Sequence, residues 1–180
     1  MFAQLLLLAS LSTPSSAAAL AGVTLPDTAT VGGAPLVLNG LGLREKLYVD
    51  VYVGGLYLPV KTTNAQTAID QDVAKRIQMT FIYSKVTRED MSTTFKEGLA
   101  KLSNATALQA QFTQLDGMMQ DVAAGQVVTI DYVPGTGTTF TFNGTKKGTI
   151  AGVDFMRAIW TIYLGPNPPT SNLKKGMLGT

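Results

Sequence analysis

Asp131 and Asp154 are two carboxylates that could serve in acid–base chemistry, because a carboxylate can accept and return a proton. A structural role explains each of them better. Asp131 can pair with Lys or Arg across a strand, and Asp154 can lie in the first turn of a helix, where the dipole favours negative charge. The glycines of PGTGT lack the lysine spacing of a phosphate-binding loop and indicate a hairpin turn instead.

The chain contains neither cysteine nor histidine. This composition excludes thiol nucleophiles, Ser-His-Asp triads, histidine metal ligands and histidine proton shuttles. We therefore expect no metal and no cofactor. The lack of cysteine leaves the redox compartment open, because an exported protein can fold without disulfides.

The length of 180 residues fits one domain, and a hydrophobic content of 46% is enough for one well-buried core. Charged residues make up 14%, against about 25% in an average soluble domain. The net charge is +2, and no basic run is present. Nucleic acid is therefore not an expected partner, since its binding sites cluster Lys and Arg.

The N-terminus predicts export to the periplasm or secretion. The apolar run Phe2 to Leu11 is too short to span a bilayer, which needs about 20 residues. Small residues at Ala19 and Ala21 fit a signal-peptidase site before Gly22. No Lys or Arg precedes the run, so a buried N-terminal helix is the alternative. We expect a signal peptide over residues 1–21, a domain over 22–180, and no transmembrane segment after signal removal.

Periodicity and turn residues predict the elements of one α+β domain. The segment Asn39 to Gly42 reads as a glycine-rich turn, and Leu43 to Leu58 as the longest strand. Asn143-Gly144 predicts a tight hairpin, so the strands are mostly antiparallel, with helices over one sheet face. Strands are also expected near residues 28–38, 76–83, 127–132, 138–142 and 145–150, and helices over 64–71, 87–102, 105–122, 153–164 and 171–178.

Five motifs are distinctive: VYVGGLYLP, DYVPGTGT, NGTKKGTIAG, DFMRAIWTIYLG and LKKGMLG. Together they resemble the bacterial, exported branch of the chalcone-isomerase-like family, and the resemblance covers nearly all of residues 22–179. It implies the chalcone-isomerase fold, a large antiparallel sheet backed by a layer of helices with a cleft between them. The family includes plant flavonoid isomerases and fatty-acid-binding relatives that do no chemistry.

The resemblance carries over little of the isomerase site. The arginine that holds the chalcone phenolate corresponds to Arg44. The other four positions (strand threonine, helix tyrosine, helix asparagine and late threonine) fall on Tyr52, on Met91 or Asp90, on Gly98, and on Ile162 with Thr161 adjacent. One of five positions matches clearly, so we name no catalytic residue and lean against an enzyme.

Arg44 with Tyr52 resembles the fatty-acid-binding relatives, in which an arginine and a tyrosine grip a carboxylate. Guanidinium gives a two-pronged, charge-assisted bond to a carboxylate, and a phenol adds a third donor. One difficulty is that eight residues of straight strand span about 26 Å, at roughly 3.3 Å each. The two groups can meet only if the strand bends between them. The alternative for Arg44 is a salt bridge to Glu45 or Asp50, and for Tyr52 a core position with a satisfied hydroxyl.

The sequence thus predicts a non-catalytic, exported protein that binds a fatty acid or another small amphipathic carboxylate. Its predicted ligand-binding residues are Arg44, Tyr52 and Thr161. One alternative is an isomerase or intramolecular lyase that acts on a phenolic or unsaturated carbonyl compound. Another is an envelope protein that binds a protein partner and no small ligand.

Overall fold

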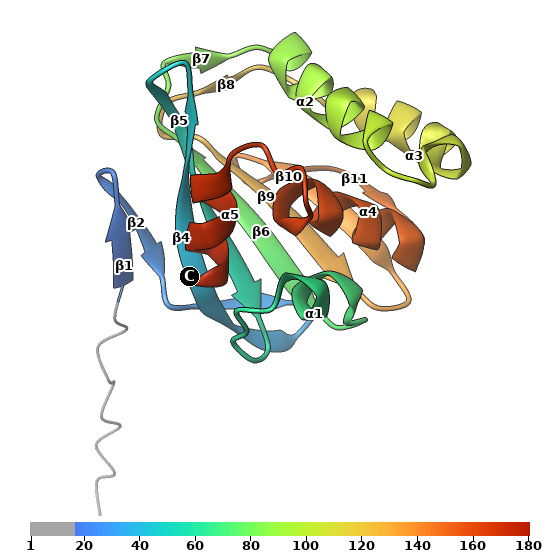
Figure 1. Cartoon of the computed structure of the whole chain (residues 1–180), viewed down its shortest axis with the longest axis horizontal. Helices are drawn as coiled ribbons and strands as arrows, with labels where there is room; N and C mark the ends of the chain where they lie inside the picture. Colours follow the sequence, from blue (N-terminus) through green and yellow to red (C-terminus); the bar gives the residue numbers. More distant parts are fainter. Residues whose placement is uncertain (1–16) are drawn as a thin grey trace, which may run out of the picture.

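The computed structural model describes residues 17–180 (Figure 1). The predicted apolar run Phe2 to Leu11 lies outside the described residues. The last part of the predicted signal peptide forms strand β1 (Ala17–Leu20), which pairs antiparallel with β2 (Val23–Pro26). Cleavage after Ala21 stays a prediction, and it would remove β1 from the fold.

A seven-stranded antiparallel sheet forms the centre of the molecule, in the order β11-β10-β9-β6-β5-β4-β3. A short ribbon of β7 (Lys85–Val86) and β8 (Val122–Ala123) lies at one end of it (Figure 1). The strands of the main sheet are β3 (Thr28–Val31), β4 (Ala34–Lys46), β5 (Val49–Leu58), β6 (Lys75–Phe81), β9 (Val127–Val133), β10 (Gly137–Phe142) and β11 (Thr145–Ile150).

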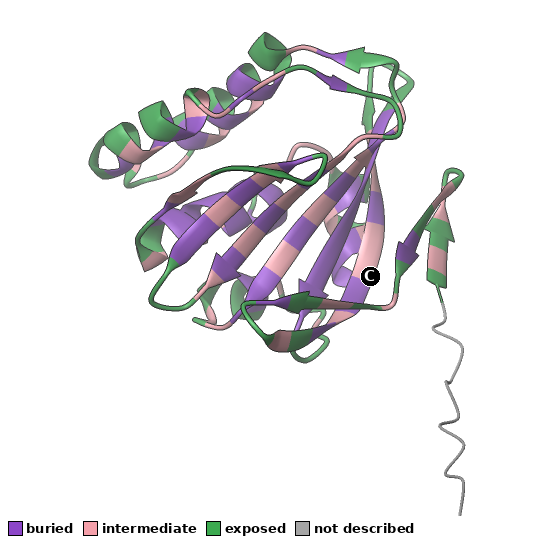
Figure 2. Ribbon diagram, turned by 180° about the vertical axis from the view of Figure 1, so that it is seen from behind, coloured by how far each residue is buried: buried purple, intermediate pink, exposed green. Residues whose placement is uncertain are grey.

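The helices lie on one face of this sheet, and the opposite face is free of helices in the view from behind (Figure 2). This arrangement confirms the predicted α+β class. The helices are α1 (Ala65–Asp70), α2 (Arg88–Ala100), α3 (Ala105–Asp116), α4 (Val153–Leu164) and α5 (Ser171–Leu178). The prediction of a helix to residue 122 was too long, because Gly117 caps α3 and the chain then extends into β8.

The core is a continuous apolar layer between the sheet and the helices. Strand β9 places Val128, Ile130 and Tyr132 in it, while the alternate residues face the other side. Helix α4 is buried along most of its circumference, and its Trp160 and Phe155 are fully enclosed. Side chains therefore fill the sheet–helix interface over most of its extent.

The face without helices carries a two-pronged ion pair between neighbouring strands. Arg76 of β6 donates to Asp131 of β9 from Nε at 2.6 Å and from an Nη at 2.7 Å, and the two residues are register partners. Asp131 therefore pairs across a strand, as expected from the sequence. Asp154 lies in the first turn of α4, also as expected.

The segment 43–58 is two strands of a hairpin and not one strand. Leu47 (φ 51°) and Tyr48 (φ 66°) both adopt left-handed backbone and reverse the chain between β4 and β5. Turns of this kind usually hold Asn-Gly. Because Leu and Tyr occupy the two positions here, the sequence carries no turn signal. Tyr48 is fully exposed at this turn.

The glycines at 40 and 42 lie within β4 and do not form the predicted turn. A Cβ on Gly40 would overlap the carbonyl oxygen of Gly176, and a Cβ on Gly42 would overlap that of Leu173. Both of these oxygens belong to α5. The glycines therefore allow the backbone of α5 to lie directly on β4.

We expect Gly42→Ala to cost about 1–3 kcal/mol of unfolding free energy, because the added methyl would push α5 off β4. Gly117→Ala is the control, since Gly117 has φ −65° and a Cβ added there would make only ordinary contacts. It should change stability by less than about 1 kcal/mol. Urea unfolding measures both, and equal losses would contradict the close approach.

A fully buried lysine connects α1 to the sheet. Lys75 Nζ donates to the backbone oxygens of Ala68 (2.8 Å), Ile69 (3.0 Å) and Gln71 (3.0 Å). The face of the Trp160 ring lies 4.9 Å from it. Burial, with a smaller effect from the positive Arg157, lowers the pKa of Lys75 to about 7.

We expect the unfolding free energy of the wild type to rise relative to that of Lys75→Met between pH 7 and pH 10. Above a folded pKa of about 7 and below the unfolded value near 10.5, the unfolded chain binds more protons than the folded chain. Stability therefore increases with pH in this window. Chemical denaturation across the range measures it, and parallel profiles for the two proteins would contradict the lowered pKa.

Candidate functional site

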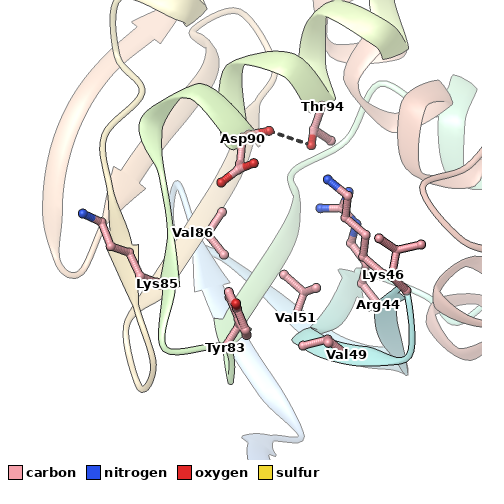
Figure 3. Close-up of a pocket in the computed structure, with 10 residues that line it drawn as sticks. Arg44, Lys46, Val49, Val51, Tyr83, Lys85, Val86, Asp90 and Thr94 are labelled. Atoms are coloured by element: carbon pink, nitrogen blue, oxygen red, sulfur yellow. Dashed lines mark hydrogen bonds between the residues drawn. The ribbon is translucent and has the colours of Figure 1, made fainter.

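A pocket of about 310 Å³ lies between helix α2 and the β4–β5 hairpin (Figure 3). We call it the α2–hairpin pocket. Its volume falls at the small end of the range for ligand pockets, about 300–1,000 Å³. The residues that line it are Arg44, Lys46, Leu47, Val49, Val51, Tyr83, Lys85, Val86, Asp90 and Thr94.

The hairpin brings Arg44 and Tyr52 together. They are register partners on adjacent strands, and the guanidinium carbon of Arg44 lies 5.6 Å from the centre of the Tyr52 ring. This removes the difficulty of the 26 Å separation along a straight strand, because the chain turns back on itself between them. The cation lies over an aromatic face, which is a favourable arrangement.

Arg44 is not committed to an acidic partner. Within residues 17–180 its guanidinium makes no ion pair, and in particular none with Glu45 or Asp50. Glu45 and Asp50 are register partners, and neither lines the pocket. Lys46 lines it beside Arg44 (Figure 3). One wall of the pocket is therefore cationic.

The opposite wall is the first turn of α2. Asp90 completes a capping box there, with its carboxylate accepting from the Thr87 hydroxyl (2.7 Å) and the Thr87 amide (3.1 Å). These hydrogen bonds, followed by the charges of Lys46 and Arg44, lower the pKa of Asp90. Asp90 is the one carboxylate among the pocket-lining residues, and it already accepts hydrogen bonds from Thr87.

Tyr52 lies beneath Arg44 and outside the lining of the pocket. Its side chain is fully buried. Its hydroxyl lies close enough to Arg44 and Tyr163 for both to lower its pKa, but it makes no hydrogen bond of ordinary geometry among the described residues. Burial raises the pKa of Tyr52, and the positive charge of Arg44 offsets part of the increase. Direct contact between Tyr52 and a ligand stays a prediction.

Tyr163 is a neighbour of this site that sequence reasoning missed. Its hydroxyl contacts the sulfur of Met79 at 3.4 Å, and burial raises its pKa well above the ordinary value. The helical pattern of α4 marks Tyr163 as a core residue only. Lys46, which also escaped notice, lies two residues after Arg44, on the pocket face of the same strand.

Thr161 does not join Arg44 and Tyr52. It lines a separate small cavity of about 20 Å³, and Arg44 is not among the residues around that cavity. Its neighbour Ile162 lines this cavity and also a hollow of about 90 Å³, and Arg44 and Thr94 line both that hollow and the α2–hairpin pocket. A ligand role for Thr161 stays a prediction.

Gly98, which the resemblance aligns with the isomerase asparagine, lies against Ile162, and a larger side chain there would require Ile162 to move. A Cβ added to Gly98 of α2 would lie 2.8 Å from Ile162 Cδ1, so these two residues pack directly on each other. Within residues 17–180, no group of three or more acidic residues lies close enough together to hold a metal ion. No described helix has the length and apolarity to cross a membrane.

The fold is an antiparallel sheet with helices on one face, and a pocket with a cationic wall lies at one end of the sheet. The model of the chalcone isomerase-like family matches residues 17–179, and the chain belongs to this family. None of the curated proteins matches the chain. The crystal structure of an Arabidopsis thaliana fatty-acid binding protein is similar, with a TM-score of 0.74 and 17% identity over 91% of this chain and 96% of that one.

We expect Tyr52→Phe to leave the unfolding free energy unchanged or to raise it by up to about 1 kcal/mol, because the removed hydroxyl is buried without a partner among the described residues. Tyr57→Phe on the same strand is the matched control. The Tyr57 hydroxyl donates to the Pro26 oxygen at 2.9 Å, so its loss should cost about 0.5–1.5 kcal/mol. Equal destabilisation in urea unfolding would show that Tyr52 has a partner.

Proposed function

We propose that this protein binds a small amphipathic carboxylate, with a fatty acid as the preferred candidate, and does so without catalysis. The observation that carries this proposal is the position of Arg44. This arginine makes no ion pair within the described chain, and it lines both the α2–hairpin pocket and the adjoining hollow. An incoming anion would supply the partner that the fold leaves out.

The head group would contact Arg44 first. A guanidinium binds a carboxylate through two parallel hydrogen bonds, which are stronger than bonds between neutral groups. The ring of Tyr52 under Arg44 restricts its side chain, so less conformational entropy is lost on binding. Lys46 adds a second positive charge at the same wall.

The hydrocarbon chain would lie along the apolar part of the same pocket. Val49, Val51, Tyr83 and Val86 supply this surface (Figure 3). The layer between sheet and helices is open here, at α2, while core side chains fill its centre. A second hollow of about 250 Å³ beside the start of α4 has no Lys or Arg in its lining and so offers no cation to a carboxylate. The ligand would therefore occupy the end of the sheet and not the centre of the core.

The structural relative supports this interpretation, since the similar Arabidopsis thaliana protein is described as a fatty-acid binding protein. The argument against catalysis rests on residues of this chain. Met91 is buried and Gly98 is packed by Ile162, so neither offers a polar group to the pocket. Asp90, the other residue that could correspond to the isomerase tyrosine, lines the pocket, but its carboxylate accepts hydrogen bonds from Thr87.

Export to the periplasm or outside the cell is part of this proposal. The apolar run Phe2 to Leu11 and the small residues Ala19 and Ala21 support it. Mass measurement of the mature protein from the cell envelope tests it. A first residue near Gly22 supports export, and an intact N-terminus in the cytoplasmic fraction would contradict it.

We expect Arg44→Ala to weaken fatty-acid binding by about 10–100-fold, the value of a charge-assisted bond. Arg157→Ala is the matched control, because Arg157 is a half-exposed arginine on α4 that does not line the pocket. Native mass spectrometry identifies any acyl ligand that co-purifies, and displacement of a fluorescent fatty acid measures affinity. The fatty-acid affinity of Arg44→Lys should lie between those of the wild type and Arg44→Ala, since lysine keeps the charge and loses the second hydrogen bond.

Equal affinity in the wild type and Arg44→Ala would contradict the proposed anchor. Wild-type protein that takes up no acyl chain would remove the fatty-acid interpretation altogether. Turnover of a chalcone that is lost in Arg44→Ala would favour the isomerase alternative, and chalcone turnover no faster than in that variant would reject it.

A further inference from the structure

Two large apolar side chains stand fully in solvent at the mouth of the α2–hairpin pocket. They belong to the hairpin tip, which we define as residues Lys46–Val49. Leu47 is 85% exposed and Tyr48 is 102% exposed, and Val49 beside them is 42% exposed. Leu47 and Val49 also line the pocket, so the exposed tip and the apolar interior of the pocket are continuous.

The backbone of the tip makes this exposure more costly. Leu47 and Tyr48 both have positive φ, a region in which bulky residues are rare and strained. Asn-Gly would suit the same two-residue turn better. Neither side chain is buried, so neither contributes packing energy that would offset the strain within the described protein.

Charges around the tip are sorted by face. Lys46 and its register partner Val49 line the pocket, and so does Arg44. The carboxylates of the hairpin, Glu45 and Asp50, form the register pair in between and do not line it. A register shift between Arg44 and Glu45 interrupts the alternation of the strands here. The residues that line the pocket from the hairpin are basic or apolar, and neither acid is among them.

The far rim of the pocket adds a further cation and an aromatic ring. Lys85 and Tyr83 both line it, and Tyr83 is 44% exposed. The Nζ of Lys85 lies 3.0 Å from a carboxylate oxygen of Asp121, and both side chains of this ion pair are exposed. Such exposed pairs are weak, so this lysine is able to contact other anions.

We propose that the hairpin tip docks on the surface of a lipid bilayer that contains anionic headgroups, with the mouth of the α2–hairpin pocket facing the membrane. Leu47 and Tyr48 enter the interfacial layer, and Lys46 and Lys85 contact the headgroups. Tyrosine favours this layer because its ring is apolar and its hydroxyl stays hydrated. Lysine extends its charge to the headgroups along an apolar stem.

The shape of the tip favours a bilayer over a protein partner. A stable protein interface buries about 800 Å² on each side, and two or three side chains at the apex of a hairpin present much less. Shallow insertion into a bilayer needs no matching surface and uses an apex of this kind. The docking goes beyond ligand binding, although it would place the pocket where an amphipathic ligand can enter from the membrane.

Vesicle flotation tests the docking with the full-length protein. The probes are vesicles of phosphatidylcholine alone and of phosphatidylcholine mixed with phosphatidylglycerol. The decisive variant is Leu47→Asn with Tyr48→Gly, which removes both apolar side chains and gives the turn the residues that its backbone favours. The control is Val60→Ser, because Val60 is 76% exposed and follows β5 at the end opposite the tip.

We expect the wild type and Val60→Ser to float with the mixed vesicles. The double variant should partition at least about tenfold more weakly, since it loses two apolar side chains. Salt or Lys46→Ala should weaken binding to the mixed vesicles and have little effect on binding to phosphatidylcholine alone. If the double variant is at least as thermally stable as the wild type, misfolding is excluded as the cause of its weaker vesicle binding.

Two results would overturn the docking. One is a wild type that floats with neither vesicle, or a double variant that floats equally well. The other is a wild type that binds no vesicles but dimerises with rising concentration in light scattering, while the double variant stays monomeric. A second copy of this chain would then be the partner of the hairpin tip. Tyr48→Gly alone separates this test from the proposed function, because Tyr48 does not line the pocket. It should weaken vesicle binding and leave fatty-acid affinity in vesicle-free solution unchanged.

Discussion

The turn at Leu47 and Tyr48 is the constraint on which the site depends. Two successive residues in left-handed backbone fold the segment 34–58 into the hairpin of β4 and β5. The resulting register sets Arg44 opposite Tyr52, directs Lys46 into the pocket, and separates both from the pair Glu45–Asp50. Without this reversal the arginine and the tyrosine would lie a strand length apart. The strained turn therefore assembles the cationic wall.

The second requirement is that the sheet stays packed against its helices while the site remains open. Gly40 and Gly42 let α5 lie on the backbone of β4, which supports the hairpin from one side. Packing of Ile162 on Gly98 holds α2 against α4. Because the aromatic core around Trp160 fills the interface behind these contacts, the α2–hairpin pocket lies at the end of the sheet and does not extend into the core. A ligand can enter there without disturbing the core.

Polar groups around the opening are only partly satisfied. Arg44 makes no ion pair within the described chain, and the buried Tyr52 hydroxyl has no partner there, whereas Tyr57, on the same strand, donates to Pro26. A buried polar group without a partner costs free energy. Trp160 in the core carries such a group as well, so it is the position of Tyr52 beside Arg44 that links its hydroxyl to the pocket. Unmet hydrogen-bonding capacity thus lies directly beside the cationic wall of the pocket.

The sequence by itself determined the elements whose signals are local. The Asn143-Gly144 hairpin, the start of α2 near residue 87 and the bounds of α4 and α5 follow from turn chemistry and periodicity. The motifs identified the family and led to the prediction of Arg44 as a ligand-binding residue. Only the tertiary structure decided the rest. The turn at Leu47 has no turn-forming residue to reveal it, and the glycines at 40 and 42 serve a helix that lies over 130 residues away in the chain. Contacts between segments so distant are set by packing, and a local pattern carries no information about them.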